Sequence, residues 1–194
     1  MKETLYTIPL NDAVNAGDEC PFCFIEREVE QDLLDFVLGS GSSYMESDVR
    51  EATDKAGFCR EHFKKMFDYG NTLGNGWILK THYIQINKEM KEQFKKFVPS
   101  RSGFMGMRKK GAEQENSVSA WVKEKEHSCY ICKRFADTYD RYMDTFFFMF
   151  KKDEDFKKRI LSSKGFCLHH FGDLCEYAES RLNDKEKKEF YSSV

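Results

Sequence analysis

The stretch GFCREH at residues 57–62 returns as GFCLHH at residues 165–170, so a chain of 194 residues contains Gly-Phe-Cys-x-x-His twice. A C-x2-C pair precedes each copy, as CPFC at 20–23 and as CYIC at 129–132. A single one-residue gap aligns the two sets, and the alignment also matches Phe63 with Phe171 and Tyr69 with Tyr177. Such self-similarity in order and register indicates an internal repeat.

The repeated residues are of the types that bind zinc. A tetrahedral zinc site takes four Cys or His ligands, commonly two from each of two short motifs. Two residues three apart at the start of a helix point the same way, so each motif can supply two ligands. The predicted metal ligands are Cys20, Cys23, Cys59 and His62 for one ion and Cys129, Cys132, Cys167 and His170 for the other. An intertwined pairing, with the C-x2-C of one half and the C-x2-H of the other, stays open.

Other uses of these cysteines fit the pattern less well. A disulfide framework would leave an odd thiol among the seven Cys and would ignore the histidines. An iron–sulfur cluster usually takes four thiolates, and covalent haem needs C-x-x-C-H, whereas Phe24 and Lys133 follow the two pairs. Because each set already has four ligands, structural zinc is favoured over catalytic zinc, which keeps an open position. We therefore expect two zinc ions per chain and no catalytic residue.

Four remaining Cys and His residues fall outside the ligand pattern. Cys175 aligns with Phe67, which predicts a small buried residue. His169 aligns with Glu61, while His82 and His127 have no counterpart in the other half. We interpret His82 and His127 as hydrogen-bonded or surface histidines, and the role of His169 stays open.

Composition and periodicity predict an all-α protein. Hydrophobic residues make up 40% of the chain, with 18 Phe, and Pro and Gly number 3 and 12. Long apolar periodic segments separated by few turn signals favour helices. The expected architecture is two pseudo-repeated, zinc-pinned helical hairpin units packed into a helical bundle. Residues 1–98 form the first half, 99–116 a linker or loop, and 117–194 the second half.

Two apolar segments carry predictions about packing. A long helix is expected from Leu73 to Val98, with an apolar stripe that would pack on the first hairpin and consists of Leu79, Tyr83, Ile86, Met90, Phe94 and Phe97. The run FFFMF at 146–150 is apolar on every side of its expected helix. We expect it in the core between the two halves, with a dimer or partner surface as the alternative.

Charge and targeting signals indicate which partners and which cellular compartment to expect. The formal net charge is −2, which gives no global attraction to nucleic acid or an anionic membrane. The segment 88–110 is locally basic, which we interpret as a solvated helix face and loop, with an anion-binding patch as the alternative. No secretory signal or membrane-spanning run is recognisable, so a cytoplasmic protein with reduced thiols and no membrane partner is expected.

The paired motifs CPFC…GFCREHF and CYIC…GFCLHHF resemble an uncharacterised family of bacterial proteins from Firmicutes, catalogued as a domain of unknown function. The resemblance covers nearly the whole chain, including YTIPLNDAV and SYMESDVR. Some members carry the label of an ABC transporter substrate-binding protein. That label implies an export signal and two α/β lobes, and this sequence predicts neither.

The sequence thus favours a zinc-binding helical protein that acts as an interaction or scaffolding module with an unknown protein partner. An enzyme is less favoured. Two alternatives stay open: a nucleic-acid-binding protein that uses the basic segment 88–110, and a zinc-thiolate redox sensor or enzyme. A homodimer is compatible with all three.

Overall fold

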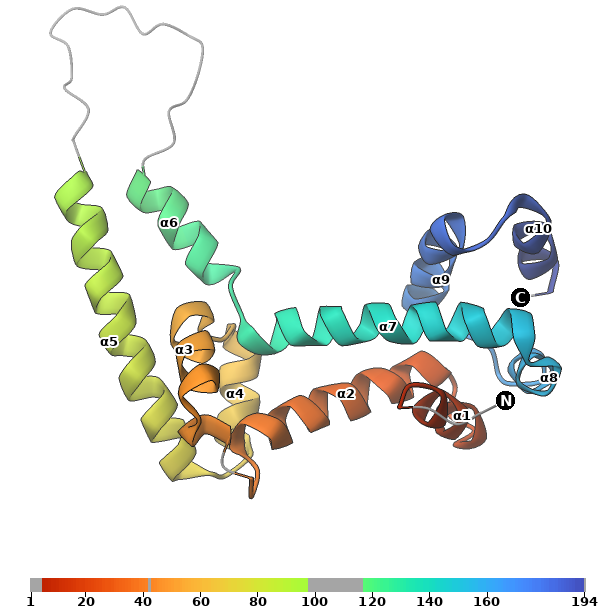
Figure 1. Cartoon of the computed structure of the whole chain (residues 1–194), viewed down its shortest axis with the longest axis horizontal. Coiled ribbons are helices and arrows are strands. Elements are labelled where there is room, and N and C mark those ends of the chain that lie inside the picture. The colour runs from red at the N-terminus through yellow and green to blue at the C-terminus, as the bar shows by residue number, and fades with distance from the viewer. Residues whose placement is uncertain (1–4, 42, 98–116, 194) are drawn as a thin grey trace, which may run out of the picture. The chain divides into compact units, whose positions relative to one another are not determined.

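The computed structural model describes residues 5–41, 43–97 and 117–193 (Figure 1). Within these ranges the chain forms α-helices and one 3-10 turn, and no strand. The all-α prediction is therefore confirmed for the described residues. The helices are α1 (Thr7–Asn15), α2 (Pro21–Leu38), α3 (Ser47–Ala56), α4 (Arg60–Asp68), α5 (Thr72–Lys96), α6 (Ser117–Glu126), α7 (Tyr130–Lys152), α8 (Glu154–Leu161), α9 (Leu168–Arg181) and α10 (Asp184–Ser193), with the 3-10 turn at Ser43–Met45.

The helices belong to two compact units. Unit 1 comprises residues 1–33 and 134–194, and unit 2 comprises residues 34–133. The boundaries fall inside α2 and α7, because the two ends of each long helix pack against different elements. The predicted halves, 1–98 and 117–194, therefore do not coincide with these units. The predicted linker 99–116 lies outside the described residues.

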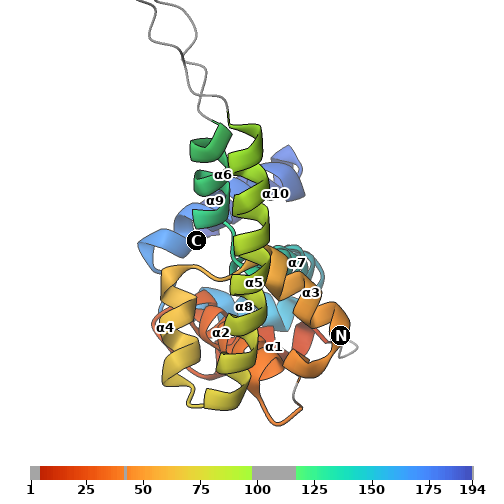
Figure 2. The ribbon, with the colours of Figure 1, turned by 90° about the vertical axis from the view of Figure 1, so that its left-hand side faces the viewer.

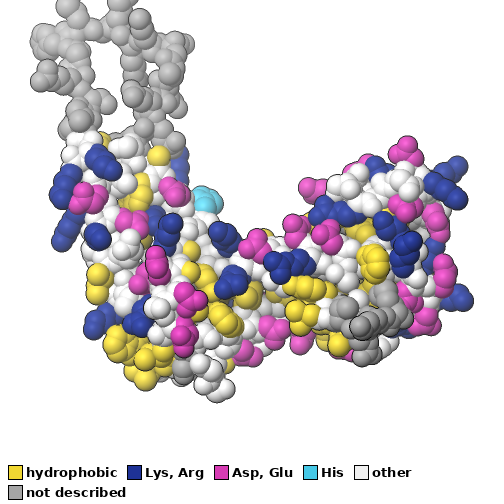
Figure 3. All heavy atoms as spheres, viewed as in Figure 1, with side chains coloured by type: hydrophobic (Ala, Val, Ile, Leu, Met, Phe, Trp, Pro, Cys, Tyr) yellow, Lys and Arg dark blue, Asp and Glu magenta, His cyan; other side chains and the backbone are white. Residues whose placement is uncertain are grey.

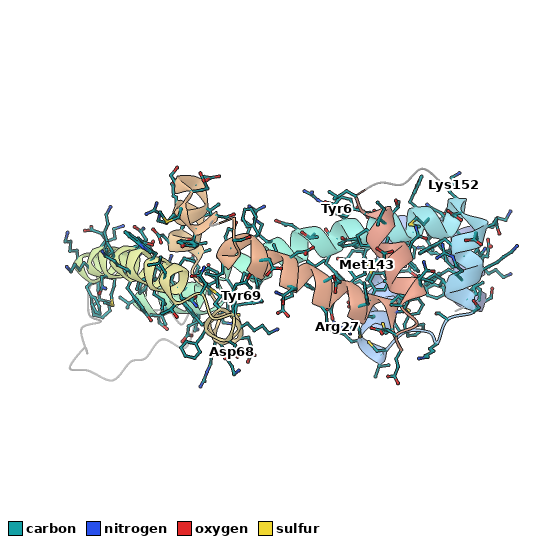
Figure 4. All side chains as sticks on the ribbon, turned by 90° about the horizontal axis from the view of Figure 1, so that it is seen from below. Tyr6, Arg27, Asp68, Tyr69, Met143 and Lys152 are labelled. Atoms are coloured by element: carbon teal, nitrogen blue, oxygen red, sulfur yellow. The ribbon has the colours of Figure 1, made fainter. Side chains whose placement is uncertain are left out.

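Unit 1 has an aromatic core. Figure 4 labels Met143, which is fully buried on α7, and Tyr6, whose ring meets Tyr142 edge-on at 5.2 Å between centroids. The run at 146–150 supplies the centre of this core, where four of its five side chains are buried and Phe148 is exposed. The core combines residues from both predicted halves, as expected for this run; its members from the first half include Leu10, Ala13, Phe22 and Ile25.

Unit 2 is built around α5. Figure 2 shows α3 and α4 beside the N-terminal part of α5 and α6 beside its C-terminal part, in agreement with the contacts between these helices. Tyr69, labelled in Figure 4 just after α4, donates a hydrogen bond to Asp35 of α2 (2.8 Å). Asn71 caps α5 by accepting from the backbone N–H of Gly74 (2.9 Å). Asn71 also donates from Nδ2 to the Leu38 carbonyl (2.7 Å), which joins the start of α5 to the end of α2.

The buried face of α5 differs from the predicted stripe. Tyr83 and Phe94 are more than half exposed, whereas Gly74, Ile78 and His82 are buried. Gly74 allows close approach, because a Cβ there would lie 3.0 Å from side-chain atoms of Leu38 and Tyr44. The packing face of α5 therefore depends on a small residue and a hydrogen-bonded histidine, which hydrophobic periodicity does not detect.

Candidate metal centres

Two groups of four Cys and His side chains converge, one in each unit. In each group the ligand atoms lie within 4.8 Å of one another. The unit-1 site consists of Cys20, Cys23, Cys167 and His170, and the unit-2 site consists of Cys59, His62, Cys129 and Cys132. All eight predicted ligands thus occur in these groups. The pairing is the intertwined one, so the assignment of each ion to one sequence half is wrong.

Helix starts position the ligands of the unit-1 site. Cys20 immediately precedes α2 and Cys167 is the residue before α9, so Cys23 and His170 lie in the first turns of these helices. The backbone carbonyls of Cys20 and Cys167 accept the first helical bonds, from Phe24 and Phe171. Helix N-termini carry partial positive charge, which favours thiolate sulfur over the neutral thiol.

The unit-2 site repeats this construction with α7 and α4. Cys129 precedes α7 and Cys59 precedes α4, and the dihedral angles of Cys59 (φ −70°, ψ 165°) match those of Cys167 (φ −66°, ψ 161°). The backbone N–H of Tyr130 also donates to the carbonyl of Gly57 (2.9 Å). Pro21 occupies the position of Tyr130 in the repeat, and a proline has no N–H to make this bond.

The S···S distance in the unit-2 site equals the edge of a tetrahedron around zinc, and the S···N distances are somewhat shorter than its edges. The Nδ1 atom of His62 lies 3.1, 3.3 and 3.3 Å from the sulfurs of Cys59, Cys129 and Cys132. With Zn–S near 2.3 Å and Zn–N near 2.0–2.1 Å, a tetrahedral site has S···N edges of about 3.6 Å and S···S edges of about 3.8 Å. The measured Cys59–Cys132 Sγ separation is 3.8 Å.

The unit-1 site has the same dimensions. His170 Nδ1 lies 3.1, 3.4 and 3.5 Å from the sulfurs of Cys167, Cys20 and Cys23, and the sulfurs of Cys23 and Cys167 are 3.8 Å apart. A disulfide would require about 2.05 Å. All seven cysteines are free thiols in the structure. In both sites the donor set and its spacing fit one tetrahedral metal ion.

The protonation of the unit-1 ligands shows why a cation would be favourable. Burial raises the pKa of Cys20, but contact with His170 and backbone N–H groups brings it down to about 6. Burial and the neighbouring sulfurs of Cys167 and Cys20 raise the pKa of Cys23 to about 12. Several thiolates therefore cannot coexist here at neutral pH without a compensating charge, which a divalent metal ion would supply.

Glu26 supports the unit-1 site from behind. Its carboxylate lies 3.2 Å from His170 Nε2, a buried atom that forms no hydrogen bond of good geometry within the described residues. Burial lowers the pKa of His170, but Cys20 and Glu26 raise it to about 9. A carboxylate on the far nitrogen of a ligating histidine fixes the ring and raises its basicity. Glu26 was not among the predicted site residues, although its position one helical turn after Cys23 indicates that it lies near the site.

The unmatched Cys and His residues are not members of the two four-residue groups, but His169 lies beside the unit-1 site. His82 is buried and its Nδ1 lies 2.9 Å from the Asp54 carbonyl, while the exposed His127 has Nδ1 2.8 Å from the Lys123 carbonyl. Both interpretations as hydrogen-bonded or surface histidines are therefore confirmed. His169 is largely exposed, with Asp173 at 3.7 Å, and one of its ring nitrogens lies within 4.8 Å of ligand atoms of Glu26 and His170. Cys175, predicted to be buried, is only half-buried.

The basic segment 88–110 is described only to residue 97. Within that part, Lys95 pairs with Glu92 (2.6 Å) on the exposed surface of α5. The rest of the segment, for which an anion-binding patch is the alternative interpretation, lies outside the described residues. None of the helices in the described ranges combines the length and apolar character needed to cross a bilayer.

The fold and the sites define an all-α protein with two Cys3His clusters that could hold metal ions. A family model described as "Family of unknown function (DUF6062)" matches residues 1–194. The chain belongs to this family, which agrees with the resemblance to an uncharacterised domain. Comparisons with curated proteins and with solved structures found no match.

Proposed function

We propose that the protein binds two zinc ions, one at each site, and that both ions have a structural role. The observation that carries this proposal is the pair of four-ligand clusters, each with one nitrogen 3.1–3.5 Å from three sulfurs. Four protein ligands complete the coordination of zinc, which is typical of structural sites. Thiolate and imidazole ligands are also soft donors, which bind zinc in preference to magnesium or calcium.

The ions would stabilise each unit by joining distant parts of the chain. The unit-1 site connects α2 to α9, and the unit-2 site connects α4 to α7. Structural zinc contributes an apparent folding free energy of about 10–16 kcal/mol in zinc-finger peptides. Loss of either ion is therefore expected to destabilise its unit strongly.

Elemental analysis of protein purified under reducing conditions without chelator tests this proposal. We expect two zinc ions per chain, and we expect chelation to lower helicity and the thermal unfolding temperature. The Cys175→Ser variant is the matched control and should keep both ions, because Cys175 lies outside the two clusters. Metal-free protein whose unfolding does not respond to added zinc would contradict the proposal.

We further propose that the zinc-stabilised helices act as an interaction or scaffolding module in a reducing compartment such as the cytoplasm. The supporting observation is a set of exposed apolar side chains at the α4–α5 end of unit 2, where Figure 3 shows hydrophobic side chains gathered. These include Phe67, Leu73 and Trp77, which are 79%, 66% and 39% exposed. Leu73 and Trp77 are four residues apart and share one face of α5.

The oligomeric state gives a first test of this module. Size-exclusion chromatography with light scattering would compare the wild type with Leu73→Ser and Trp77→Ser. A dimer that both substitutions dissociate would identify a second copy as the partner. A monomer in all three proteins would exclude self-association and direct the search to another protein.

A further inference from the structure

The two sites share a ligand set but differ in their surroundings. In unit 1, Cys20 and His170 are 1% exposed, and the His170 ring lies near Phe22 (5.8 Å, stacked) and Tyr139 (6.1 Å). Cys20 belongs to the aromatic core, and the other two sulfur ligands pack against it. Cys20 is therefore shielded from water and dissolved oxidants, while Cys23 and Cys167 are half-buried.

The unit-2 site is more open to solvent. Cys132 is exposed and Cys59 is half-buried, whereas Cys129 is 6% exposed. Cys23, the counterpart of Cys132 in the repeat, is half-buried against the unit-1 core. At the same position of the repeat, unit 2 therefore has the exposed Cys132 and unit 1 has the half-buried Cys23.

The histidine of the unit-1 site also has a carboxylate behind it. The Glu26 carboxylate lies 3.2 Å from His170 Nε2. Carboxylates behind ligating histidines typically contribute about 10–100-fold in metal affinity. Exposure and this support both favour retention of the unit-1 ion.

We propose that the unit-2 site is a peroxide-sensitive zinc site, at which oxidation of Cys132 and Cys59 releases the ion while the unit-1 ion is retained. This inference rests on the zinc binding proposed above. The oxidant is hydrogen peroxide or another small peroxide, which reaches the exposed Cys132 first. Unit 2 would then respond to oxidants while unit 1 stays folded.

The chemistry balances with one peroxide per ion. The Cys132 thiolate attacks one peroxide oxygen and breaks the O–O bond, which gives a sulfenic acid and, after protonation, water. The Cys59 thiolate attacks the sulfenic sulfur and displaces hydroxide, which becomes a second water. Two thiolates lose two electrons in total, peroxide gains them, and two protons are taken up. The disulfide sulfurs no longer carry the charge that bound zinc, so the ion leaves.

Cys59 is the partner that solvent accessibility favours. Its sulfur lies 3.8 Å from that of Cys132, and it is more accessible than Cys129. Cys129 is further engaged, because its sulfur accepts the backbone N–H of Cys132 (3.4 Å). The resulting disulfide would join the starts of α4 and α7, the same elements that zinc joins.

Limited peroxide treatment of the full-length zinc-loaded protein tests the inference. A chromogenic chelator should report fast release of one ion, while the second remains bound. Trypsin cleaves after Lys55, Arg60, Lys125 and Lys133, which places Cys59 and Cys132 in separate peptides. Digestion of the oxidised protein should therefore yield peptides 56–60 and 126–133 joined by a disulfide. Thiol reductant with added zinc should restore two ions. Equal release from both sites, or a disulfide confined to peptide 126–133, would overturn the proposal.

The Glu26→Gln variant tests the contribution of this carboxylate to the unit-1 site. It should weaken zinc binding at the unit-1 site by about 10–100-fold in chelator competition and leave the fast release from unit 2 unchanged. An unchanged unit-1 affinity would contradict the role of Glu26 as a positioning residue. Protein that contains no zinc before oxidation would refute the zinc proposal itself, whereas two ions lost in step would refute only the difference between the sites.

Discussion

Substitution of Gly57 by alanine tests how the loop before the unit-2 ligands is built. Gly57 has φ 66° and ψ −158°, a region that is essentially restricted to glycine, and an alanine there costs about 1–3 kcal/mol in strain. Its Cβ would also lie 2.6 Å from Cε1 of His82. His82 would have to move and lose its contact with the Asp54 carbonyl, at a further cost of about 1–3 kcal/mol for a buried polar group. The expected loss of unfolding free energy is therefore about 2–6 kcal/mol, the sum of both effects.

Gly165 is the matched control in the other repeat. It has φ 95°, but a Cβ there meets no atom within 4 Å. Gly165→Ala should therefore cost only the backbone strain, about 1–3 kcal/mol. Urea unfolding followed by far-ultraviolet circular dichroism would measure both variants in the zinc-loaded state. A Gly165→Ala cost equal to or larger than that of Gly57→Ala would refute the reasoning about His82.

Two further predictions concern the unit-1 core and the α5–α6 contact. Phe146→Ala should lower the free energy of unfolding by about 3–5 kcal/mol, because the ring is 1% exposed and is surrounded by other aromatic rings. Phe148 is exposed, so Phe148→Ala should cost no more than about 0.5 kcal/mol. Urea unfolding would measure both. Burial raises the pKa of Glu89, but hydrogen bonds and its 2.7 Å pair with Lys125 leave it below the usual 4.5. A depressed carboxyl pKa stabilises the fold above the unfolded value and loses that contribution as pH falls through the folded value. The stability advantage of the wild type over Glu89→Gln should thus be full at neutral pH and vanish in acid, and an advantage independent of pH would contradict this assignment.

The all-α class and the convergence of the Cys and His residues could be predicted because their signals are local. Asn183, for example, caps α10 by accepting from the backbone N–H of Glu186 (3.0 Å). Every C-x2-C and C-x2-H pair lies at a helix start, where the spacing of three residues directs both side chains to one side. Such features depend on a few neighbouring residues and need no knowledge of the tertiary fold.

The pairing of the motifs could not be predicted from the same signals. Both C-x2-C pairs and both C-x2-H pairs offer the same chemistry, so each combination satisfies a tetrahedral site equally well. The choice is made by long-range packing, in which Phe22 of α2 meets Phe146 of α7 and Phe166 before α9. These contacts bring the start of α2 to the start of α9. The division into units follows from the same packing and therefore also escaped sequence analysis.

Other differences have equally specific causes. The helix α1 was not predicted, since its buried residues are Thr7, Leu10 and Ala13, of which only Leu10 is strongly apolar. On α5, the Thr81 hydroxyl donates a hydrogen bond to the Asp54 carboxylate (2.5 Å), and His82 Nδ1 lies 2.9 Å from the Asp54 carbonyl. Polar side chains therefore occupy the packed face of this helix. Hydrophobic periodicity cannot assign a face that is stabilised by hydrogen bonds.

The zinc content of two double variants tests the central claim most directly. Cys23→Ser with Cys167→Ser removes two ligands of the unit-1 site, while Cys23→Ser with Cys59→Ser removes one ligand from each site. Elemental analysis should find one zinc ion per chain in the first variant and none in the second, against two in the wild type. A first variant that binds no zinc would contradict the account. A wild type that binds no zinc would contradict it as well.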